Sequence, residues 1–477
     1  MAKKSIVKNY IYNIIYNLLN ILFPIITLSY VSKILFADGV GKVAFAANIV
    51  SYFLVISQLG IPRYGPREIA TQRDDREKVS KAFWEIFITN FISTTIMIIL
   101  YYSVINNKMI PFQEIALMNI FGLMLFFNLF NVDWFYTGIE EYKYITIRSI
   151  ISKIISIIAL FIFVKEKEDY IWYGLIQCCG TGINYFFNII NLRKFILRPK
   201  LKELCLKKHL KSIILLFSMT LAVELYSQLD TTMLGIMCGN KEVGYYTNSI
   251  KMTKMIVIVI TSLSTVLLPR LSWYYENKEN KKINEIVDFA LKFVVFLAFP
   301  ACCGIIVVSK PIILTMYGID FSESILTFKL LATLIPIMSI GNLFGTQILV
   351  VFRKEKELLF SVIIGAVINM ILNTILISLF RHNGAVIATI IAEFCVMIAQ
   401  YIFARKYIVL NFKLKELVQI LIGSITIFIV SILKYFISNL VLLMIVQILC
   451  GILLYILIEV LFKNKILYDI LGFIKRK

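Results

Sequence analysis

Eight charged side chains inside long apolar stretches of this sequence are candidates for chemistry. They are Lys153, Glu224, Asp230, Lys251, Lys254, Lys292, Lys329 and Glu393. A Lys, Arg or Asp at the centre of a membrane helix costs about 2.5–3.5 kcal/mol on insertion scales, so such residues pair with each other or mark a functional site. Cationic side chains can hold an anion, and carboxylates can bind a cation or a proton. Lys292 and Lys329 lie near the ends of their stretches, where snorkelling explains them.

Polar residues recur at helical spacing in several of these stretches. The stripes are Asn13, Asn17, Asn20 and Thr27 in the first stretch, Gln177, Thr181, Asn184 and Asn188 in the sixth, Thr220, Glu224, Ser227 and Gln228 in the seventh, and Asn248, Lys251 and Ser262 in the eighth. In lipid, a helix turns its polar side toward protein or water. Hydrogen bonds between helices explain a single stripe. Stripes at equivalent places in both halves favour a shared polar cavity.

The stretches that carry these residues predict an all-α polytopic membrane protein. Of the 477 residues 59% are hydrophobic and 16% charged, with a mean hydropathy of +0.83, whereas soluble domains are about 45–50% apolar and about 25% charged. The apolar blocks lack the alternation typical of a β-barrel. We expect about 14 transmembrane helices, at residues 10–31, 43–61, 83–105, 112–136, 144–164, 170–191, 212–234, 246–268, 286–308, 325–351, 359–380, 384–404, 416–437 and 440–462.

The net charge of +20 is distributed between loops and not gathered on one soluble face, so no nucleic-acid partner is expected. One alternating set of loops, with both termini, holds about 35 of the 49 Lys and Arg residues, and the opposite set about 8. By the positive-inside rule both termini are cytoplasmic. The first apolar run exceeds 20 residues and lacks a cleavage site, so we expect an uncleaved first helix.

A weak internal repeat suggests two equivalent halves. Val40-Gly41 precedes Pro62-Arg63 as Val243-Gly244 precedes Pro269-Arg270. The two copies lie six spans apart, an even number, so the halves share one orientation and a pseudo-two-fold axis along the membrane normal. We predict two six-helix lobes, 1–210 and 211–408, and two additional transmembrane helices with a cytoplasmic tail, 409–477. The last two helices show almost no polar stripe and are predicted to be peripheral.

Neither the cysteines nor the histidines indicate a metal or a cofactor. The eight cysteines lie mostly inside spans, without a CxxC motif, and are expected to be buried free thiols. Of the two histidines, His209 and His382, the second is expected to be a solvated residue of a short external turn. A GxxxxGK[ST] loop is absent from the sequence, which disfavours ATP-driven transport.

Four segments resemble the polysaccharide transporter branch of the multidrug/oligosaccharidyl-lipid/polysaccharide exporter superfamily, in particular Wzx-type O-antigen and capsule repeat-unit flippases. The segments are Gly60 to Ala70, Asp133 to Glu140, Leu229 to Tyr246 in two parts, and Leu268 to Leu271. The resemblance covers nearly the whole chain. It implies two six-helix lobes around a cavity that opens alternately to each side of the bacterial cytoplasmic membrane. The last two helices resemble those of 14-helix members.

The polar residues match what a polyprenyl-diphosphate-linked oligosaccharide would require: cations for the diphosphate, hydrogen-bonding groups for the sugar and a side open to lipid. We expect Lys251, Lys254 and Lys153 to hold the diphosphate. We expect the sugar to be bound by Asn13, Asn17, Asn20, Tyr16, Tyr52, Asn248, Gln228, Gln177 and Asn184. Candidates for binding a coupling H⁺ or Na⁺ are Glu224, Asp230 and Glu393. Other polysaccharide-assembly proteins are candidate partners, beside membrane lipids.

Two alternatives stay open. A drug/cation antiporter of the same superfamily would need a smaller and more acidic cavity, whereas the charges inside the spans are of mixed sign. A membrane polysaccharide polymerase would need a large external loop rich in Arg and His, whereas the external loops here are short. We therefore expect a transporter and not an enzyme.

Overall fold

The computed structural model describes residues 6–107, 114–199, 201–410 and 413–469, and all regular secondary structure in these ranges is helical. The predicted class, an all-α polytopic membrane protein, is confirmed. The chain divides into two compact units, Met1–Thr232 and Met233–Lys477. The predicted lobe limits at residues 210 and 408 stay predictions.

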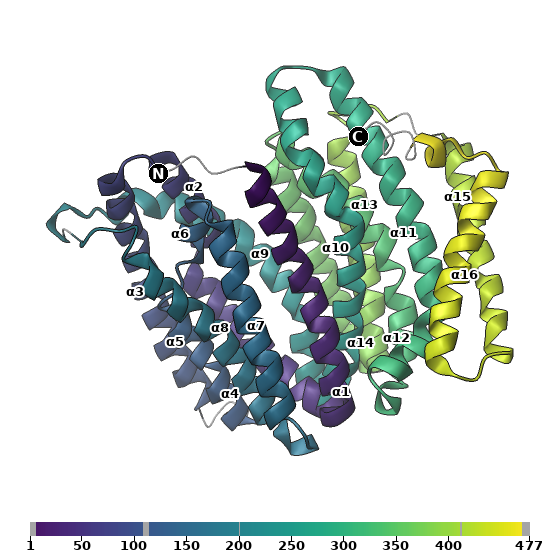
Figure 1. Ribbon diagram of the computed structural model, residues 1–477, viewed down its shortest axis with the longest axis horizontal. Coiled ribbons are helices and arrows are strands. Elements are labelled where there is room, and N and C mark those ends of the chain that lie inside the picture. The colour runs from purple at the N-terminus through teal and green to yellow at the C-terminus, as the bar shows by residue number, and fades with distance from the viewer. Residues whose placement is uncertain (1–5, 108–113, 200, 411–412, 470–477) are drawn as a thin grey trace. The chain divides into compact units, whose positions relative to one another are not determined.

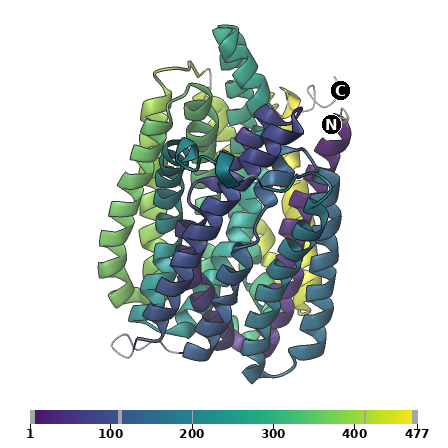
Figure 2. The same ribbon diagram turned by 90° about the vertical axis from the view of Figure 1, so that its left-hand side faces the viewer.

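Unit 1 contains a long first helix, four short helices and four further long ones, of which the last continues past the limit of the unit. They are α1 (Ile6–Gln58), α2 (Ile61–Gln72), α3 (Arg76–Ile105), α4 (Ile115–Phe121), α5 (Leu123–Asn128), α6 (Asp133–Gly138), α7 (Tyr142–Phe163), α8 (Tyr170–Leu192) and most of α9 (Lys207–Met237). The first part of α1 lies beside α7 in both views (Figures 1 and 2), and α7 and α8 pack against each other.

At the start of α3, the side chain of Asp75 accepts hydrogen bonds from the backbone N–H groups of Glu77 and Lys78. The bond from Lys78 lowers the pKa of Asp75.

The helix count agrees with the predicted spans once broken helices are considered. Nine helices in the described ranges are long and apolar enough to cross a membrane, and the bent pair Asn240–Ser262 and Leu267–Glu276 makes ten. Two of these, Leu22–Gln72 and Glu355–Ala404, hold 51 and 50 residues, over twice the roughly 20 needed for one crossing. Each is broken at a left-handed residue, Phe36 or Arg381, and so supplies two of the predicted spans. The shorter Ile115–Asn128 segment and the more polar α8 complete the set.

The fourth predicted span, 112–136, is not one continuous helix. It is divided into α4, α5 and the start of α6. At Gly122, between α4 and α5, a Cβ atom would lie 2.4 Å from the hydroxyl oxygen of Tyr102, so the backbone passes close to α3. Further on, the side-chain oxygen of Asn131 accepts the backbone N–H of Asp133 at 3.2 Å. Such local bonding of Asn side chains competes with a continuous helix.

Two of the segments that carry the family resemblance interlock in unit 1. A Cβ atom at Gly65 in α2 would lie 2.6 Å from the Trp134 ring of α6, and one at Gly138 in α6 would lie 2.8 Å from the Cβ of Ile69. The indole of Trp134 stacks on Phe83 of α3, with ring centroids 5.5 Å apart. The glycines are therefore required for the close packing of α2 on α6.

Unit 2 consists mainly of long helices, with irregular helical segments in two of its spans. Its helices are α10 (Asn240–Glu276), α11 (Asn280–Met316), α12 (Ser324–Leu331), α13 (Leu334–Asn342), α14 (Glu355–Ala404), α15 (Leu414–Thr426) and α16 (Leu440–Leu461). A π-helical segment, Leu343–Leu349, follows α13, and a 3₁₀ segment, Ile427–Tyr435, follows α15. α15 and α16 lie side by side next to α11 (Figure 1).

The last helix, α16, buries polar residues on one face, among them Gln447 and Glu459, which the sequence interpretation had considered scattered. Buried residues recur every four positions along α16, including Gln447, Tyr455 and Glu459. Tyr455 donates to the carbonyl oxygen of Phe296 in α11 at 2.9 Å. The fully buried Glu459 accepts from Asn464 at 2.6 Å. The expectation of almost no stripe is therefore wrong, because this face is turned toward α11 and α15.

Candidate functional site

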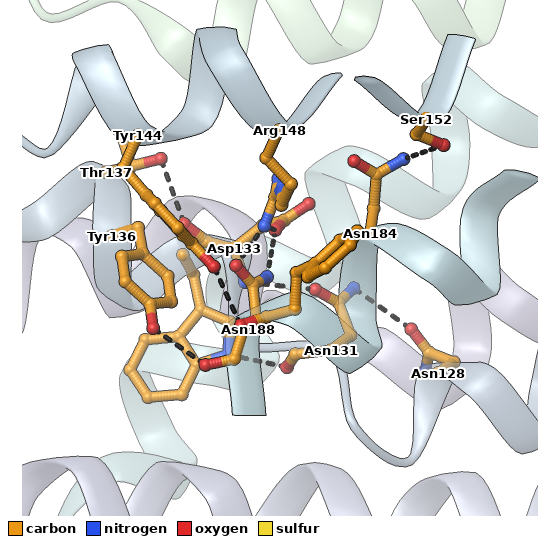
Figure 3. Close-up of polar contacts among 12 residues, drawn as sticks. Asn128, Asn131, Asp133, Tyr136, Thr137, Tyr144, Arg148, Ser152, Asn184 and Asn188 are labelled. Carbon is orange, nitrogen blue, oxygen red and sulfur yellow. Dashed lines mark hydrogen bonds and ion pairs between the residues drawn. The ribbon is translucent and has the colours of Figure 1, made fainter. Parts of the chain in front are cut away.

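A polar cluster lies where α6, α7 and α8 meet in unit 1 (Figure 3). Arg148, in the second turn of α7, forms an ion pair with Asp133, the first residue of α6, with 3.0 Å between Nη1 and Oδ1. Asn188 of α8 donates to the same carboxylate oxygen at 2.5 Å. The Arg148 guanidinium also donates to the side-chain oxygen of Asn188. The three side chains thus form a closed triangle of bonds that joins three elements.

Two tyrosines brace this triangle from one side (Figure 3). Tyr136 of α6 donates to the backbone carbonyl of Asn188 at 2.7 Å. Tyr144 of α7 donates to the carbonyl of Phe187 at 2.7 Å, and its ring lies 5.7 Å from the guanidinium carbon of Arg148. Arg148 therefore has aromatic, amide and carboxylate neighbours.

The members of the triangle differ sharply in their access to the surface of the unit. The side chain of Arg148 is 5% exposed and that of Asp133 is 44% exposed, while Asn188 is fully buried. The cation is thus enclosed, and the group presented at the surface is the carboxylate. A ligand that approaches this part of unit 1 would meet an acceptor oxygen before it met the guanidinium.

The polar stripe continues along the contact between α7 and α8. Ser152 donates to the carbonyl of Gly180 at 2.6 Å. Asn184 donates to the Ser152 hydroxyl at 3.0 Å and to the Gly180 carbonyl at 2.9 Å. The side-chain oxygen of Asn184 is buried and accepts no hydrogen bond within the described part of the chain. Polar residues of the stripe predicted in the sixth span therefore form hydrogen bonds between α7 and α8, and the side-chain oxygen of Asn184 is the acceptor without a donor among the described residues.

Lys153 lies near the middle of α7 and contacts α1. Its ammonium donates to the side-chain oxygen of Asn20 at 2.6 Å and lies 5.5 Å from the centre of the Phe23 ring. Among the described residues no carboxylate lies within 4.0 Å of this ammonium. Two of the predicted binding residues, Lys153 and Asn20, are thus brought together, and the cation is not neutralised by an acid.

Tyr52 belongs to a second polar cluster in unit 1, between α1 and α9. Its hydroxyl lies 2.7 Å from the hydroxyl of Thr232, which also receives a hydrogen bond from Asn48 at 2.6 Å. Asp230, two residues before Thr232 in α9, is buried. Tyr52 is half-buried, so part of its ring is left for contact with a ligand.

The other residues predicted to bind in unit 1 are spread along several helices. Tyr16, Gln177, Glu224 and Gln228 are half-buried. The side chain of Tyr16 packs against an aromatic cluster around Phe83 and Trp134. Glu224 has no ion-pair partner among the described residues of this unit. The side chains of Asn13 and Asn17 lie outside the described residues.

Four predicted site residues belong to unit 2. Asn248 is fully buried, Lys251 is exposed on the surface of the unit, and Lys254 and Glu393 are half-buried. Lys251 lies on a helix that also presents exposed apolar residues such as Ile258 and Val259. The proposed roles of these residues stay predictions.

Sequence reasoning missed the charged residues that anchor the cluster of unit 1. Asp133 stood in a segment quoted for the resemblance but was not considered a site residue, and Arg148 was not considered at all. The available signal was the spacing of Arg148, Ser152 and Ser156, which lie four residues apart on one face of α7.

Both histidines are buried, which contradicts the expectation for His382. Its side chain is 8% exposed, and Nδ1 bonds to Glu242, a residue of the first turn of α10. His209 is fully buried between Glu85, whose carboxylate lies 2.7 Å from Nε2, and Tyr64, whose hydroxyl lies 2.6 Å from Nδ1. The sequence predicted a solvated turn because Glu242, the acidic partner of His382, lies 140 residues away in the chain.

Lys292 was expected to snorkel, and in the structure its ammonium forms an ion pair with Asp288 at 2.8 Å.

Comparison with known proteins places these features in a family. The family model described as polysaccharide biosynthesis protein matches residues 6–274, more than half of the chain, and the MatE model matches residues 216–375. The chain is 22% identical to the "Putative O-antigen transporter" of Escherichia coli K12, over 84% of this chain and 97% of that protein. It is 24% identical to the capsular polysaccharide biosynthesis protein CapF of Staphylococcus aureus, over 84% and 99% of the two chains.

Solved transporter structures share the fold of this chain. The lipid II flippase MurJ in an inward closed conformation superposes with a TM-score of 0.78 and 18% identity, over 96% of this chain and all of that one. An inward-facing multidrug resistance transporter of the MATE family superposes with a TM-score of 0.62 and 12% identity, over 81% and 93%. At these identities the likeness establishes the fold alone.

Proposed function

The chain belongs to the polysaccharide biosynthesis protein family, and from this premise we propose that it is a flippase for polyprenyl-diphosphate-linked oligosaccharide repeat units. The observation that carries the proposal is Lys153, a cation near the middle of an apolar helix whose bonded partner is the neutral Asn20. An ion at membrane depth without a counter-ion is costly. A diphosphate would supply the missing negative charge, and the neighbouring amides suit a sugar.

We infer that transport proceeds by alternating access between two six-helix lobes, 1–210 and 211–408, with residues 409–477 as an addition. Lys251 and Lys254 contribute further positive charge for the diphosphate in this scheme. Tyr16 and Tyr52 offer ring faces to the sugar, and amides of the polar stripes offer donors and acceptors. The names of relatives, an O-antigen transporter and a capsular polysaccharide biosynthesis protein, support this substrate class.

The protein is proposed to reside in the bacterial cytoplasmic membrane with both termini in the cytoplasm, as its distribution of Lys and Arg favours. Cation coupling is assigned to Glu224, Asp230 or Glu393, with H⁺ or Na⁺ as the ion. Glu224 is the first candidate, because it lacks an ionic partner within the described part of unit 1.

The test is reconstitution of the purified protein in liposomes that contain a polyprenyl-diphosphate-linked oligosaccharide. Flipping is measured as the rate at which the sugar becomes accessible to an impermeant glycosidase. We expect Lys153→Met to slow this rate at least tenfold, while the control Lys143→Met, an exposed lysine on the same helix, leaves it unchanged. A wild-type protein that gives no rate above empty liposomes would overturn the proposal.

A drug/cation antiporter is the second candidate, favoured by the match of residues 216–375 to the MatE model. The same liposomes decide between the two when they are loaded with a cationic dye and given a proton or sodium gradient. Dye movement without movement of the lipid-linked sugar would establish the antiporter.

A further inference from the structure

The carboxylate of Asp133 has one oxygen engaged and one oxygen available. Oδ1 receives both the Arg148 guanidinium at 3.0 Å and the Asn188 amide at 2.5 Å. No bond to Oδ2 occurs within the described part of the chain, and the side chain is 44% exposed. Asp133 therefore presents a negatively charged acceptor that is held in a fixed orientation from behind.

A second acceptor lies one helical turn away on α8. The side-chain oxygen of Asn184 is buried without a donor among the described residues, while its nitrogen is held by Ser152 and Gly180. Asn184 and Asn188 are four residues apart and so lie on the same face of α8. The acceptor exposed to a ligand in this part of unit 1 is therefore the Asp133 carboxylate, with the buried Asn184 oxygen behind it, and a ligand that binds there must bring donors.

We propose that Asp133 determines which sugar head groups the protein accepts, by binding hydroxyl or ammonium donors and by excluding acidic sugars. This inference rests on the proposed function. Sugar hydroxyls and amino groups donate hydrogen bonds to carboxylates, whereas a uronic acid brings a second negative charge. The buried Arg148 reduces that repulsion without removing it, because the guanidinium lies at Oδ1 and a uronic carboxylate that approached Oδ2 would be nearer to the Asp133 charge than to the Arg148 charge.

Lys153 lies five residues beyond Arg148 on α7, about 7.5 Å along the helix axis. Lys153, proposed to bind the diphosphate, and Asp133, proposed to bind the sugar, therefore occupy separate but neighbouring parts of unit 1. The two charges act on different portions of the same ligand, so a change at Asp133 should alter selection between head groups while leaving the attraction for the diphosphate in place.

The experiment measures binding of two probes to the purified full-length protein in detergent by native mass spectrometry. Both probes carry the same polyprenyl diphosphate, one linked to a neutral N-acetylhexosamine and the other to a hexuronic acid. We expect wild type to prefer the neutral probe by about tenfold, less than two isolated like charges a few ångström apart would give, because Arg148 offsets part of the Asp133 charge. Asp133→Glu should keep the preference, because it keeps the charge.

Asp133→Asn alone leaves the Arg148 charge buried without a counter-ion and can unfold the protein, so the decisive variant is the double change Asp133→Asn with Arg148→Met. We expect it to bring the preference to within about twofold of unity. The matched control is Glu140→Gln, which removes a carboxylate of similar exposure, 42%, from an ion pair with Arg73, and should keep the wild-type preference.

The outcomes separate this inference from the proposed function. If wild type binds neither diphosphate-linked probe, the proposed function fails. If it binds both equally, or if the double variant retains the wild-type preference, Asp133 does not select the head group and the inference is wrong, although the flippase assignment stands.

Discussion

The Arg148–Asp133–Asn188 triangle makes a quantitative prediction about stability. In Asp133→Asn the new amide can still accept a bond from Arg148, but the guanidinium, 5% exposed, loses its counter-ion. Removing one partner of a buried ion pair costs about 3–5 kcal/mol. Because Asp133 is half-exposed we expect the lower end, about 3 kcal/mol. For a unit of 150–250 residues this corresponds to a fall in melting temperature of about 6–12 °C.

A second substitution should restore most of the lost stability. Arg148→Met on the Asp133→Asn background removes the buried charge and fills much of the space with an apolar chain. The amides at positions 133 and 188 can then bond to each other, so that no polar group in the triangle is stranded. We expect the double variant to melt within about 2–4 °C of wild type, which corresponds to about 1 kcal/mol.

The assay is thermal unfolding in one detergent, followed by intrinsic tryptophan fluorescence. Trp134 adjoins Asp133 and is buried, so it reports on this site. The control is Glu140→Gln, which breaks an ion pair whose members are 45% and 42% exposed and should cost about 0–1 kcal/mol. A double variant that is less stable than Asp133→Asn alone would refute the reasoning, because it would show that the buried charge is not the source of the loss.

Three further predictions test other parts of the chain. Glu224→Gln should abolish ion-dependent transport in liposomes without lowering the melting temperature, and a loss of stability with transport intact would contradict its role. Single cysteines at Arg73 and Asn106 should be labelled by an impermeant maleimide from opposite sides of the membrane, the first from the cytoplasm; labelling from one side would overturn the span list. Gly423→Ala should lower the melting temperature, by about 1–3 kcal/mol of stability, because its Cβ would lie 2.6 Å from the buried carboxylate of Glu459; an unchanged melting temperature would show that α16 is free to shift.

Much of the fold could be predicted because a membrane imposes simple rules on a helix. A crossing requires about 20 apolar residues, and both the break at Phe36 and the break at Arg381 fall between predicted spans. The rules are weaker for α8, whose Gln177, Asn184 and Asn188 lower its hydropathy. The span at 170–191 was nevertheless predicted, and its polar residues follow the helical period.

The candidate site was harder to predict, because a stripe identifies a polar face but not what that face contacts. The Asn residues of α8 were expected to bind a ligand, yet the side chain of Asn188 forms hydrogen bonds with Arg148 and Asp133. Likewise His382 looked exposed in its turn, and only the fold brings Glu242 to it. Pairings between distant residues depend on how elements pack, and a single sequence contains no direct signal for them.

The segments that carry the family resemblance have a physical role that links recognition to the site. Gly65 and Gly138 permit α2 and α6 to pack closely, with Trp134 fixed between Gly65 and Phe83. Asp133 immediately precedes that tryptophan, so the same packing sets the position from which its carboxylate reaches Arg148. Small residues in α2 thus act on the polar cluster at a distance, by holding the short helix that begins with Asp133. The segments Gly60 to Ala70 and Asp133 to Glu140 indicated the family because they form the packed structure that holds the site. They gave no information about ligand contact, because side chains such as Trp134 are buried in that packing.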